Sequence, residues 1–237
     1  STTPSVISVA SNKFSDAAGN MNADGADANN TVSLPTNTTP AQTSGQLQPQ
    51  SDSGTQGDNK TFDNTPAYGG TAPAGSQVEV VINGKTYTTV ADSNGQYSVV
   101  VPDALPDGTY VPKIIVTPAG SSTPNAPQDG TPFTIDTTPP TVVVSSDKSA
   151  LSAGQTATIS FTLSEASADF TLADVEVSGG TLSNFQGSGT AYTATFTPTA
   201  QSTQTSVVHV ASNKFADAAG NFNTDGAQSN NTVSMDT

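Results

Sequence analysis

The sequence predicts an all-β protein built from β-sandwich domains in tandem. Three observations lead to this fold class. Thr, Ser, Val, Gly, Asn and Pro are abundant, whereas helix formers such as Glu, Lys, Arg and Leu are scarce. Short runs in which apolar and polar residues alternate are separated by turn residues. Finally, one segment of the chain occurs twice in nearly identical form.

The repeated segment defines the domain organisation. Residues 6–34 (VISVASNKFSDAAGNMNADGADANNTVSL) match residues 207–235 (VVHVASNKFADAAGNFNTDGAQSNNTVSM) without a gap. The offset of 201 residues leaves room for a different domain between two copies of one module. We therefore interpret residues 1–39 as the C-terminal part of a truncated domain plus a linker. Residues 40–136 form a domain of a second class, and residues 137–237 form a complete domain of the same class as 1–36.

The predicted strands follow from the period-2 pattern. In the last domain they are 141–146, 155–163, 174–178, 181–185, 190–196, 205–211 and 231–235. In the middle domain they are 66–71, 77–83, 85–91, 96–102, 109–117 and 132–136, and the stretch from Leu47 to Pro66 reads as a polar loop. Asn83-Gly84 is a predicted tight hairpin turn, and Asp92-Ser93-Asn94-Gly95 is predicted to join the next two strands.

Core packing is predicted from the same alternation. On strand 155–163, Ala157, Ile159, Phe161 and Leu163 face one way, and Tyr192, Ala194 and Phe196 do so on strand 190–196. Phe215 and Phe222 are also expected to pack in the core. Residues 1–36 hold only two strands, which cannot bury a core of their own. We therefore expect that segment to be mobile unless it pairs with a partner, and the whole chain to be a piece of a longer protein.

The charge balance excludes several partners. The chain has six Lys, no Arg and twenty acidic residues, which gives a net charge of −14. Such a surface repels nucleic acid and anionic membranes. No apolar run approaches the roughly 18 residues of a membrane span, so we expect no membrane insertion by this segment. The absence of Cys removes disulfides and thiolate metal sites.

The sequence also argues against an enzyme. A nucleophilic triad would need His209, the single histidine. Its counterpart in the first copy of the repeat is Ser8, and its neighbours Val208 and Val210 occupy the core register. We therefore expect His209 on the solvent face, without a catalytic role.

The acidic loop of the repeat is a candidate metal site. Asp217, Asn221, Asn223 and Asp225 place oxygen atoms at closely spaced positions, and the last three match the opening half of an EF-hand loop. The closing Glu of an EF-hand is replaced by Thr232, and strands flank the loop, so a true EF-hand is excluded.

Sandwich topology supplies further oxygens to this loop. The segment 164–169, predicted as a loop, carries Glu165 and Asp169, and the linker into the last domain carries Asp136. All three segments should meet at the pole where the chain enters the domain. Close carboxylates repel by roughly 1 kcal/mol or more per pair, and a divalent cation such as calcium removes that cost. The alternative is that these side chains only form Asx-turns.

Two further groups have the same residue types. In the middle domain Asp52, Asp58, Asn59 and Asp63 form a second calcium candidate, although a solvated acidic linker would have the same composition. In the first copy of the repeat the corresponding residues are Asp16, Asn20, Asn22 and Asp24.

Longer sequence motifs resemble a known family. Residues 139–237, through TPPTVVVSSDKSALSAGQTATISFTLSEASADFTLADVEVSGGTL and NKFADAAGNFNTDGA, resemble bacterial Ig-like repeats of giant biofilm-associated and RTX-type surface adhesins. Residues 50–138 resemble a second Ig-like class, through SDSGTQGDNKTFDNTPAYGGTAPAGSQVEVVING, DSNGQYSVVVPDALPDGTY and TIDTTPP. They depart from it in the loop TPAGSSTPNAPQDG, which lacks the DAAGN form often found there, so the resemblance does not carry a calcium ligand over to this loop. The resemblance implies tandem immunoglobulin-like β-sandwich domains that form calcium-stiffened stalks.

The resemblance leads to a functional hypothesis. We expect a structural stalk segment of a secreted or cell-surface adhesin, acting in cell adhesion and biofilm formation, with neighbouring Ig-like repeats of the same chain as partners. Calcium would stiffen the Asp-Thr-Thr-Pro-Pro hinge, in which Pro139 and Pro140 fix φ. The alternatives are an Ig-like module that binds a host or matrix glycan or protein, and a spacer in a secreted hydrolase. The adhesive ligand is not identified by the sequence.

Overall fold

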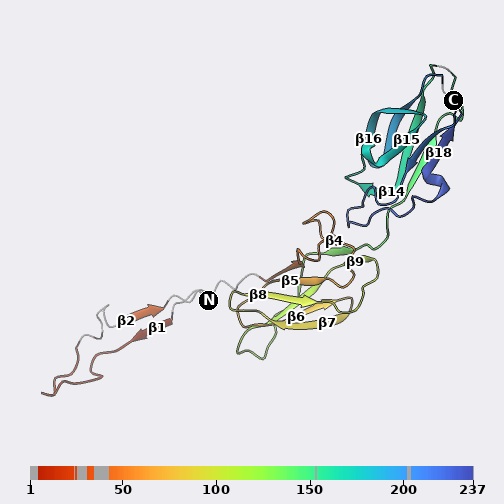
Figure 1. Ribbon diagram of the computed structural model, residues 1–237. Coiled ribbons are helices and arrows are strands. Elements are labelled where there is room, and N and C mark those ends of the chain that lie inside the picture. The colour runs from red at the N-terminus through yellow and green to blue at the C-terminus, as the bar shows by residue number, and fades with distance from the viewer. Residues whose placement is uncertain are drawn as a thin grey trace. The chain divides into compact units, whose positions relative to one another are not determined.

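The computed structural model describes residues 5–23, 25, 31–34, 43–152, 154–201 and 204–236 (Figure 1). The chain separates into two compact units, Ser1–Gln42 and Thr43–Thr237. Regular structure in the described residues is almost entirely strand. The helical elements among them are two turns of 3-10 helix, η2 (Leu172–Asp174) and η3 (Ser229–Asn231). The predicted all-β fold class is therefore confirmed.

The first unit contains a β-hairpin. β1 (Ser5–Ser8) pairs antiparallel with β2 (Thr31–Leu34), first residue opposite last. In the second copy of the repeat, β17 (Ser206–Val210) and β18 (Thr232–Met235) pair in the same register. The pairing is thus a property of the repeated segment, present in both copies. The expected mobility of residues 1–36 stays a prediction.

The second unit begins with a β-sandwich formed by residues 43–136, here called the first sandwich. Its strands are β3 (Ser44–Leu47), β4 (Lys60–Thr61), β5 (Ala67–Thr71), β6 (Gln77–Ile82), β7 (Lys85–Val90), β8 (Gln96–Val100), β9 (Gly108–Tyr110), β10 (Lys113–Thr117), β11 (Gln128–Asp129) and β12 (Phe133–Ile135). They form the sheets β11-β10-β6-β7, β3-β5-β8 and β4-β12-β9. The core between them contains Tyr68, Ile82, Ile114 and Phe133, all fully buried.

Two predictions for the first sandwich are wrong. The predicted strand 109–117 is two strands, β9 and β10, which belong to different sheets. Pro112 lies between them, and because proline has no backbone N–H to donate, a sheet-to-sheet crossing is favoured there. The stretch from Leu47 to Pro66 is not loop throughout, because β4 lies within it and pairs parallel with β12. The predicted turn at Asn83-Gly84 is confirmed, with both residues at positive φ.

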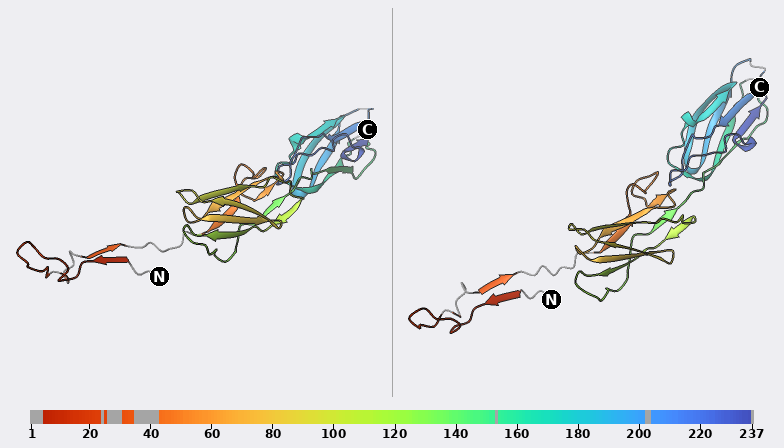
Figure 2. Two further views of the ribbon diagram at one scale, coloured as in Figure 1. Left: turned by 90° about the horizontal axis from the view of Figure 1, so that it is seen from below. Right: turned by 60° about the horizontal axis from the view of Figure 1, so that its bottom comes forward.

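Residues 137–236 form the second sandwich, with a core of its own. Its strands are β13 (Val142–Ser146), β14 (Ala157–Ser167), β15 (Val175–Ser178), β16 (Gly180–Pro198), β17 and β18, in the sheets β13-β14-β16 and β15-β17-β18. The predicted inward faces of β14 and β16 are confirmed, since the side chains named for both strands are all buried. Figure 2 shows β14 and β16 running along this sandwich.

Two strands of the second sandwich are longer than predicted. β14 continues to Ser167 past an irregularity between Thr162 and Ser167, so most of the segment 164–169 is strand rather than loop. The hydroxyl of Tyr192 donates to the Ser167 carbonyl at 2.9 Å, which holds this extension on the sheet. β16 spans both predicted strands 181–185 and 190–196 and doubles back, since the Thr199 N–H donates to the Gly179 carbonyl at 2.8 Å.

Candidate metal centre

Three carboxylates from distant parts of the sequence meet between the two sandwiches. Asp136 follows β12, Glu165 lies in the irregular part of β14, and Asp217 lies in the loop between β17 and β18. One oxygen from each lies within 4.8 Å of the other two. Asp217 is buried, and Asp136 and Glu165 are half-buried. We call Asp136, Glu165 and Asp217 the acidic triad.

The environment of the acidic triad changes the ionisation of Glu165. Burial raises the pKa of Glu165 to about 7, and the negative charges of Asp136 and Asp217 act in the same direction. A hydrogen bond to Asp136 further favours the protonated form of Glu165 and so raises its pKa. The protein therefore holds three negative groups closer together than their charges favour.

The position of Asp217 is set by its own loop. Its Oδ1 accepts from the Gly220 and Asn221 N–H groups at 2.8 and 3.0 Å, and its Oδ2 accepts from the Asn221 amide at 2.9 Å. The Asn221 amide also donates to the Asp136 carbonyl at 2.8 Å. Asn221 therefore links the loop to the linker as a hydrogen-bond donor. Asp169 lies beside this loop, where its Oδ1 accepts from the Ala216 N–H at 3.0 Å and the Ser167 hydroxyl at 2.6 Å.

Asn223 and Asp225 lie away from the triad, in the interior of the loop. Asn223 Oδ1 accepts from the backbone N–H groups of Lys214 and Phe215 at 2.8 and 3.3 Å. Asp225 accepts from the Val142 N–H at 2.8 Å and from the Asn223 amide at 3.1 Å. Both side chains are almost fully buried. Their oxygens accept from protein donors that are eight or more residues away or from the Asn223 side chain, so these two residues form neither the predicted metal site nor Asx-turns.

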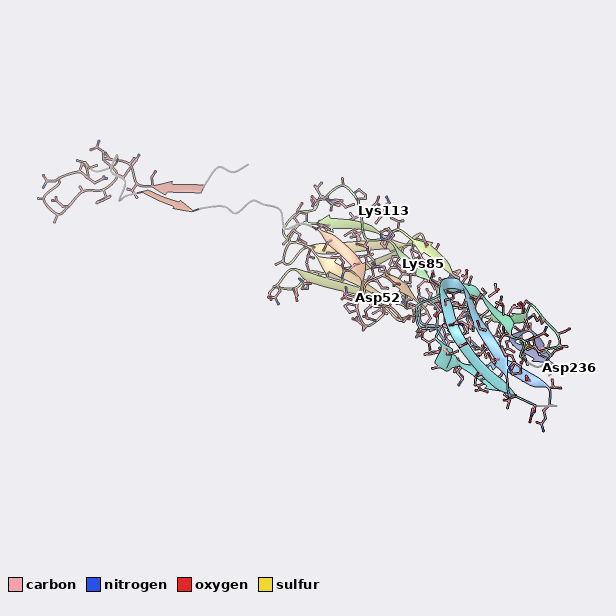
Figure 3. All side chains as sticks on the ribbon, turned by 90° about the horizontal axis from the view of Figure 1, so that it is seen from above. Asp52, Lys85, Lys113 and Asp236 are labelled. Atoms are coloured by element: carbon pink, nitrogen blue, oxygen red, sulfur yellow. The ribbon has the colours of Figure 1, made fainter. Side chains whose placement is uncertain are left out.

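The candidates of the first sandwich are not gathered in the same way. Asp58 Oδ1 accepts from the Lys60 N–H at 2.9 Å, and Asp63 Oδ1 from the Thr65 N–H at 3.0 Å, so both form Asx-turns. The backbone carbonyl of Asn59 accepts from the Thr134 N–H at 2.8 Å. Asp52, labelled in Figure 3, is buried and accepts from the Gly57 N–H at 2.6 Å. Its Oδ1 has no hydrogen-bond partner among the described protein atoms.

The first copy of the repeat has the same loop, built on the counterparts of Asp217, Asn221 and Asn223. Asp16 Oδ1 accepts from the Ala18 and Asn20 N–H groups, both at 2.9 Å. The hydrogen bond from the Asn20 side chain is the main cause that lowers the pKa of Asp16. Asn22 Oδ1 accepts from the Lys13 N–H at 2.7 Å. Asp24 lies outside the described residues.

The linker is fixed by a residue that the sequence did not indicate. Asp107 accepts from the Thr137 N–H at 3.1 Å, the Thr137 hydroxyl at 2.8 Å and the Thr138 hydroxyl at 3.0 Å. These bonds, the one to the Thr137 side chain foremost, lower the pKa of Asp107. The Asp-Thr-Thr-Pro-Pro segment is thus tied to the loop before β9 through Thr137 and Thr138, and its stiffening by calcium stays a prediction.

Comparison with known proteins identifies the two sandwiches. Two family models match the chain, one over residues 38–137 and the other over residues 136–234, and each is described as a bacterial Ig-like domain. The chain is a tandem of bacterial Ig-like domains. The resemblance drawn from the sequence is confirmed for the Ig-like repeats.

The remaining comparisons add little. No curated protein matches the chain. Among solved structures, a β-glycosidase from Bacteroides vulgatus is 12% identical, with a TM-score of 0.27 over 81% of this chain and 24% of that one. The chain spans about a quarter of that enzyme, and the likeness carries no argument. In the part of the chain that the structure describes, no helix has the length and apolar character to cross a membrane.

The two Ig-like domains also touch directly, which sequence reasoning missed. Ser53 and Thr55 of the first domain contact the backbone of Ala218 and Ala219 in the second. A neighbouring hollow of about 630 Å³ is lined by both domains. Phe62 and Phe222 line it with 48% and 53% of their surfaces exposed, so the prediction that Phe222 packs in the core is wrong. Phe215 is fully buried, as predicted.

Proposed function

We propose that this tandem of Ig-like domains is a structural extender in the stalk of a bacterial surface adhesin, outside the cell, in cell adhesion and biofilm formation. We further propose that calcium stiffens the joint between the domains. The acidic triad carries this proposal, because it joins the linker residue Asp136 to Glu165 and Asp217 of the second domain. The linker is also tied to the first domain by Asp107. An ion at the triad would therefore fix the joint on both sides.

The donor set suits calcium. Calcium takes six to eight oxygen ligands at about 2.3–2.6 Å, and each carboxylate supplies one or two of them. Carboxylates of the triad offer hard oxygen atoms, and carbonyl groups or water would complete the shell. Burial first, and the charges of Asp136 and Asp217 next, raise the pKa of Glu165, so ionised Glu165 is disfavoured in the triad. A divalent cation would offset this effect and hold Glu165 ionised.

The contacts of His209, the single histidine of the chain, also agree with a mechanical role. His209 is half-buried, and its Nδ1 lies 2.7 Å from the Thr232 hydroxyl on the neighbouring strand. Glu176 lies opposite it on β15, and its carboxylate pairs with Lys214 at 3.4 Å. These contacts join neighbouring strands of the sheet β15-β17-β18. We therefore propose a non-catalytic module.

Calcium titration tests the proposal. A ligand that binds only the folded state stabilises it by about 2.7 kcal/mol at 100 times its dissociation constant, and extracellular modules bind calcium at roughly 0.1–1 mM. The melting temperature of the second domain should rise with millimolar calcium and return with chelator. Asp136→Asn should remove most of this response. Asp103→Asn is the matched control, because Asp103 is exposed in the first domain and pairs with Lys85. A wild-type melting temperature that ignores calcium would contradict the proposal.

Stiffening needs a separate measurement. Because the chain has no cysteine, Thr88→Cys and Gln186→Cys place one spin label on an exposed site of each domain. Calcium should narrow the distribution of distances between the two labels. With calcium present, Asp136→Ala should broaden it again while each domain stays folded. Equal widths with calcium and with chelator would show that the ion does not stiffen the joint.

A second candidate function is ligand binding at the hollow between the domains. Two half-exposed phenyl rings there offer an apolar surface beside the carboxylates of Asp169 and Asp217. A host or matrix glycan would stack on such rings and donate hydroxyl groups to the acids. Glycan binding that is lost in Phe62→Ala and Phe222→Ala, at unchanged melting temperature, would favour this function. Absence of glycan binding by the wild-type chain would leave the extender role.

A further inference from the structure

We propose that residues 11–23 of the first unit form a docking surface for an Ig-like domain of the same class as residues 43–136. The basis is the second copy of this loop, residues 212–226, which is docked on such a domain within this chain. This inference needs no calcium and is independent of the proposed role of the acidic triad.

The docked copy is held by backbone contacts. The Ser53 hydroxyl donates to the Ala219 carbonyl at 2.5 Å, and the Thr55 N–H donates to the Ala218 carbonyl at 3.2 Å. Between these bonds Gly54 and Gly220 meet without side chains. A Cβ on Gly54 would lie 2.4 Å from the Ala218 carbonyl oxygen, and a Cβ on Gly220 would lie 2.8 Å from the Gly54 nitrogen. The contact therefore requires glycine on both sides.

The contacting residues are identical in the first copy. Ala17, Ala18, Gly19 and Asn20 correspond to Ala218, Ala219, Gly220 and Asn221 at the repeat offset. Gly19 has φ of 88° and Gly220 has φ of 93°, a left-handed conformation that favours glycine. No described atom lies within 4 Å of the place that a Cβ on Gly19 would take. Within the described residues of the first unit, the surface that the second copy buries is thus uncovered.

The first copy also has the docked conformation before any partner covers it. The Asp16 N–H donates to the Asn20 carbonyl at 3.0 Å, as Asp217 does to Asn221 at 3.1 Å. The Asn22 amide donates to the Ala10 carbonyl at 3.0 Å, as Asn223 does to Ala211 at 2.9 Å. The Gly25 N–H donates to the Ser11 hydroxyl at 2.9 Å, as Gly226 does to Ser212 at 2.9 Å. A surface that is already in its bound shape loses less conformational entropy on docking.

The contacts define the partner. It needs a Ser-Gly-Thr turn like Ser53–Thr55, with the glycine at positive φ as in Gly54 and a hydroxyl before it. It also needs a backbone carbonyl in the place of the Asp136 carbonyl, to accept from the Asn20 amide as that carbonyl accepts from Asn221. Both features belong to the 43–136 class. The second sandwich also has a Ser-Gly-Thr sequence with its glycine at positive φ, Ser188–Thr190, but this sequence lies within β16, where Gly189 pairs with Ser167 of β14.

The full chain allows a direct test, since the two loops differ at three positions. Ala216→Ser, Phe222→Met and Thr224→Ala together convert residues 212–226 into the sequence of residues 11–25. If this sequence docks on the 43–136 class, the label pair at positions 88 and 186 should keep its wild-type distance distribution in this triple variant. Adding Gly220→Val to the triple variant should broaden the distribution of distances between the two labels, because a Cβ at this position would lie 2.8 Å from the Gly54 nitrogen.

The measurement is made in chelator as well as in calcium, so that failure of the calcium proposal does not affect it. Melting temperatures verify that both domains are folded in each variant. A triple variant that is folded but has a broadened distribution would overturn the inference, because the loop sequence of the first unit would then not support docking. The same conclusion would follow if Gly220→Val left the distribution narrow.

Discussion

The two copies of the repeated loop have one conformation in two environments. Residues 11–25 and 212–226 share their pattern of Asx hydrogen bonds. They also share the short bridge across the loop, Ser15 to Met21 in one copy and Ala216 to Phe222 in the other. Burial differs. The side chain of Phe14 is 60% exposed, whereas that of its counterpart Phe215 is completely buried.

This difference shows that the loop conformation depends on residues of the loop itself, whereas side-chain burial depends on the rest of the domain. The Asp side chains accept from N–H groups two to four residues away, and the Asn side chains accept from N–H groups eight or nine residues away. All these donors and acceptors belong to the loop itself, so they fix its conformation wherever it occurs. A side chain of the repeat is buried in a core only when the other strands of the sandwich are present to cover it. In the second copy Phe170 supplies the partner ring, with centroids 5.1 Å apart in an edge-to-face arrangement with Phe215.

The largest expected difference between the copies is at this phenylalanine. Phe215→Ala should destabilise the second Ig-like domain by about 3–5 kcal/mol, because it leaves a cavity where the ring packs against Phe170. Phe14→Ala is the matched control and should change no melting transition by more than about 0.5 kcal/mol, as for other exposed sites. Calorimetry of the full chain measures both. Similar effects of the two substitutions would show that Phe14 has a core that the described residues do not include.

The next difference is at the asparagine inside the loop. Asn223 is fully buried, so Asn223→Ala leaves the Lys214 and Phe215 N–H groups without their acceptor. Unsatisfied buried groups cost about 1–3 kcal/mol. Asn22→Ala should abolish only the local protection of the Lys13 and Phe14 amides, which hydrogen exchange resolves. Equal exchange of these two amides in wild type and Asn22→Ala would contradict local encoding of the loop.

Much of the fold is predictable from the sequence because it depends on short-range patterns. Alternation identifies the buried faces of β14 and β16, and a repeat without gaps predicts the matching hairpins β1–β2 and β17–β18. Topology also explains why Asp136, Glu165 and Asp217 meet, since the three segments that carry them converge where the chain enters the second domain. Their role as calcium ligands stays a prediction.

The remainder depends on contacts with no local signal. In a sequence, an alternating run of Asn and Asp looks the same whether its oxygens bind an ion or accept hydrogen bonds from backbone N–H groups. The structure shows that the buried residues Asn223 and Asp225 do the latter. Asp107 is thirty residues away from Thr137 in sequence, and no periodicity relates the two. Likewise, Gly54 and Gly220 each suggest a turn, but their close approach across the domain boundary follows only from the tertiary structure.

A smaller expected effect concerns acid titration of Glu165 beside the second copy and of Asp16 in the first. In chelator, the pKa of Glu165 is raised to about 7 from its ordinary value of 4.5, so between these pH values the folded state binds more protons than the unfolded state. Stability of the second domain should therefore fall by a few degrees in melting temperature as the pH rises from about 5 to 8, an effect limited by solvent screening of a half-exposed group. Glu165→Gln should remove this slope.

Asp16 of the first unit should titrate in the opposite sense. Its pKa is lowered, so its contribution to the loop is present above its ordinary pKa and is lost as the pH falls. Carboxyl NMR shifts of Asp16 and Glu165 measure both directions in one titration. Millimolar calcium should shift the Glu165 titration to lower pH, because the ion competes with the proton. A Glu165 that titrates at its ordinary pKa in chelator would show that the triad is open in solution.

The smallest expected effect is a substitution that the repeat itself contains. His209 corresponds to Ser8, and its Nδ1 contacts the Thr232 hydroxyl at 2.7 Å on a half-buried sheet face. His209→Ser should cost about 0.5 kcal/mol or less, since a partly exposed hydrogen bond contributes little net stability and no core contact is lost. Val208→Ser, one residue away on the buried face, is the matched contrast and should cost several times more, because it places an unsatisfied hydroxyl in the core. Chemical denaturation of both variants gives the comparison. If His209→Ser were as costly as Val208→Ser, the solvent-facing interpretation of this position, and with it the equivalence of the two strand copies, would be wrong.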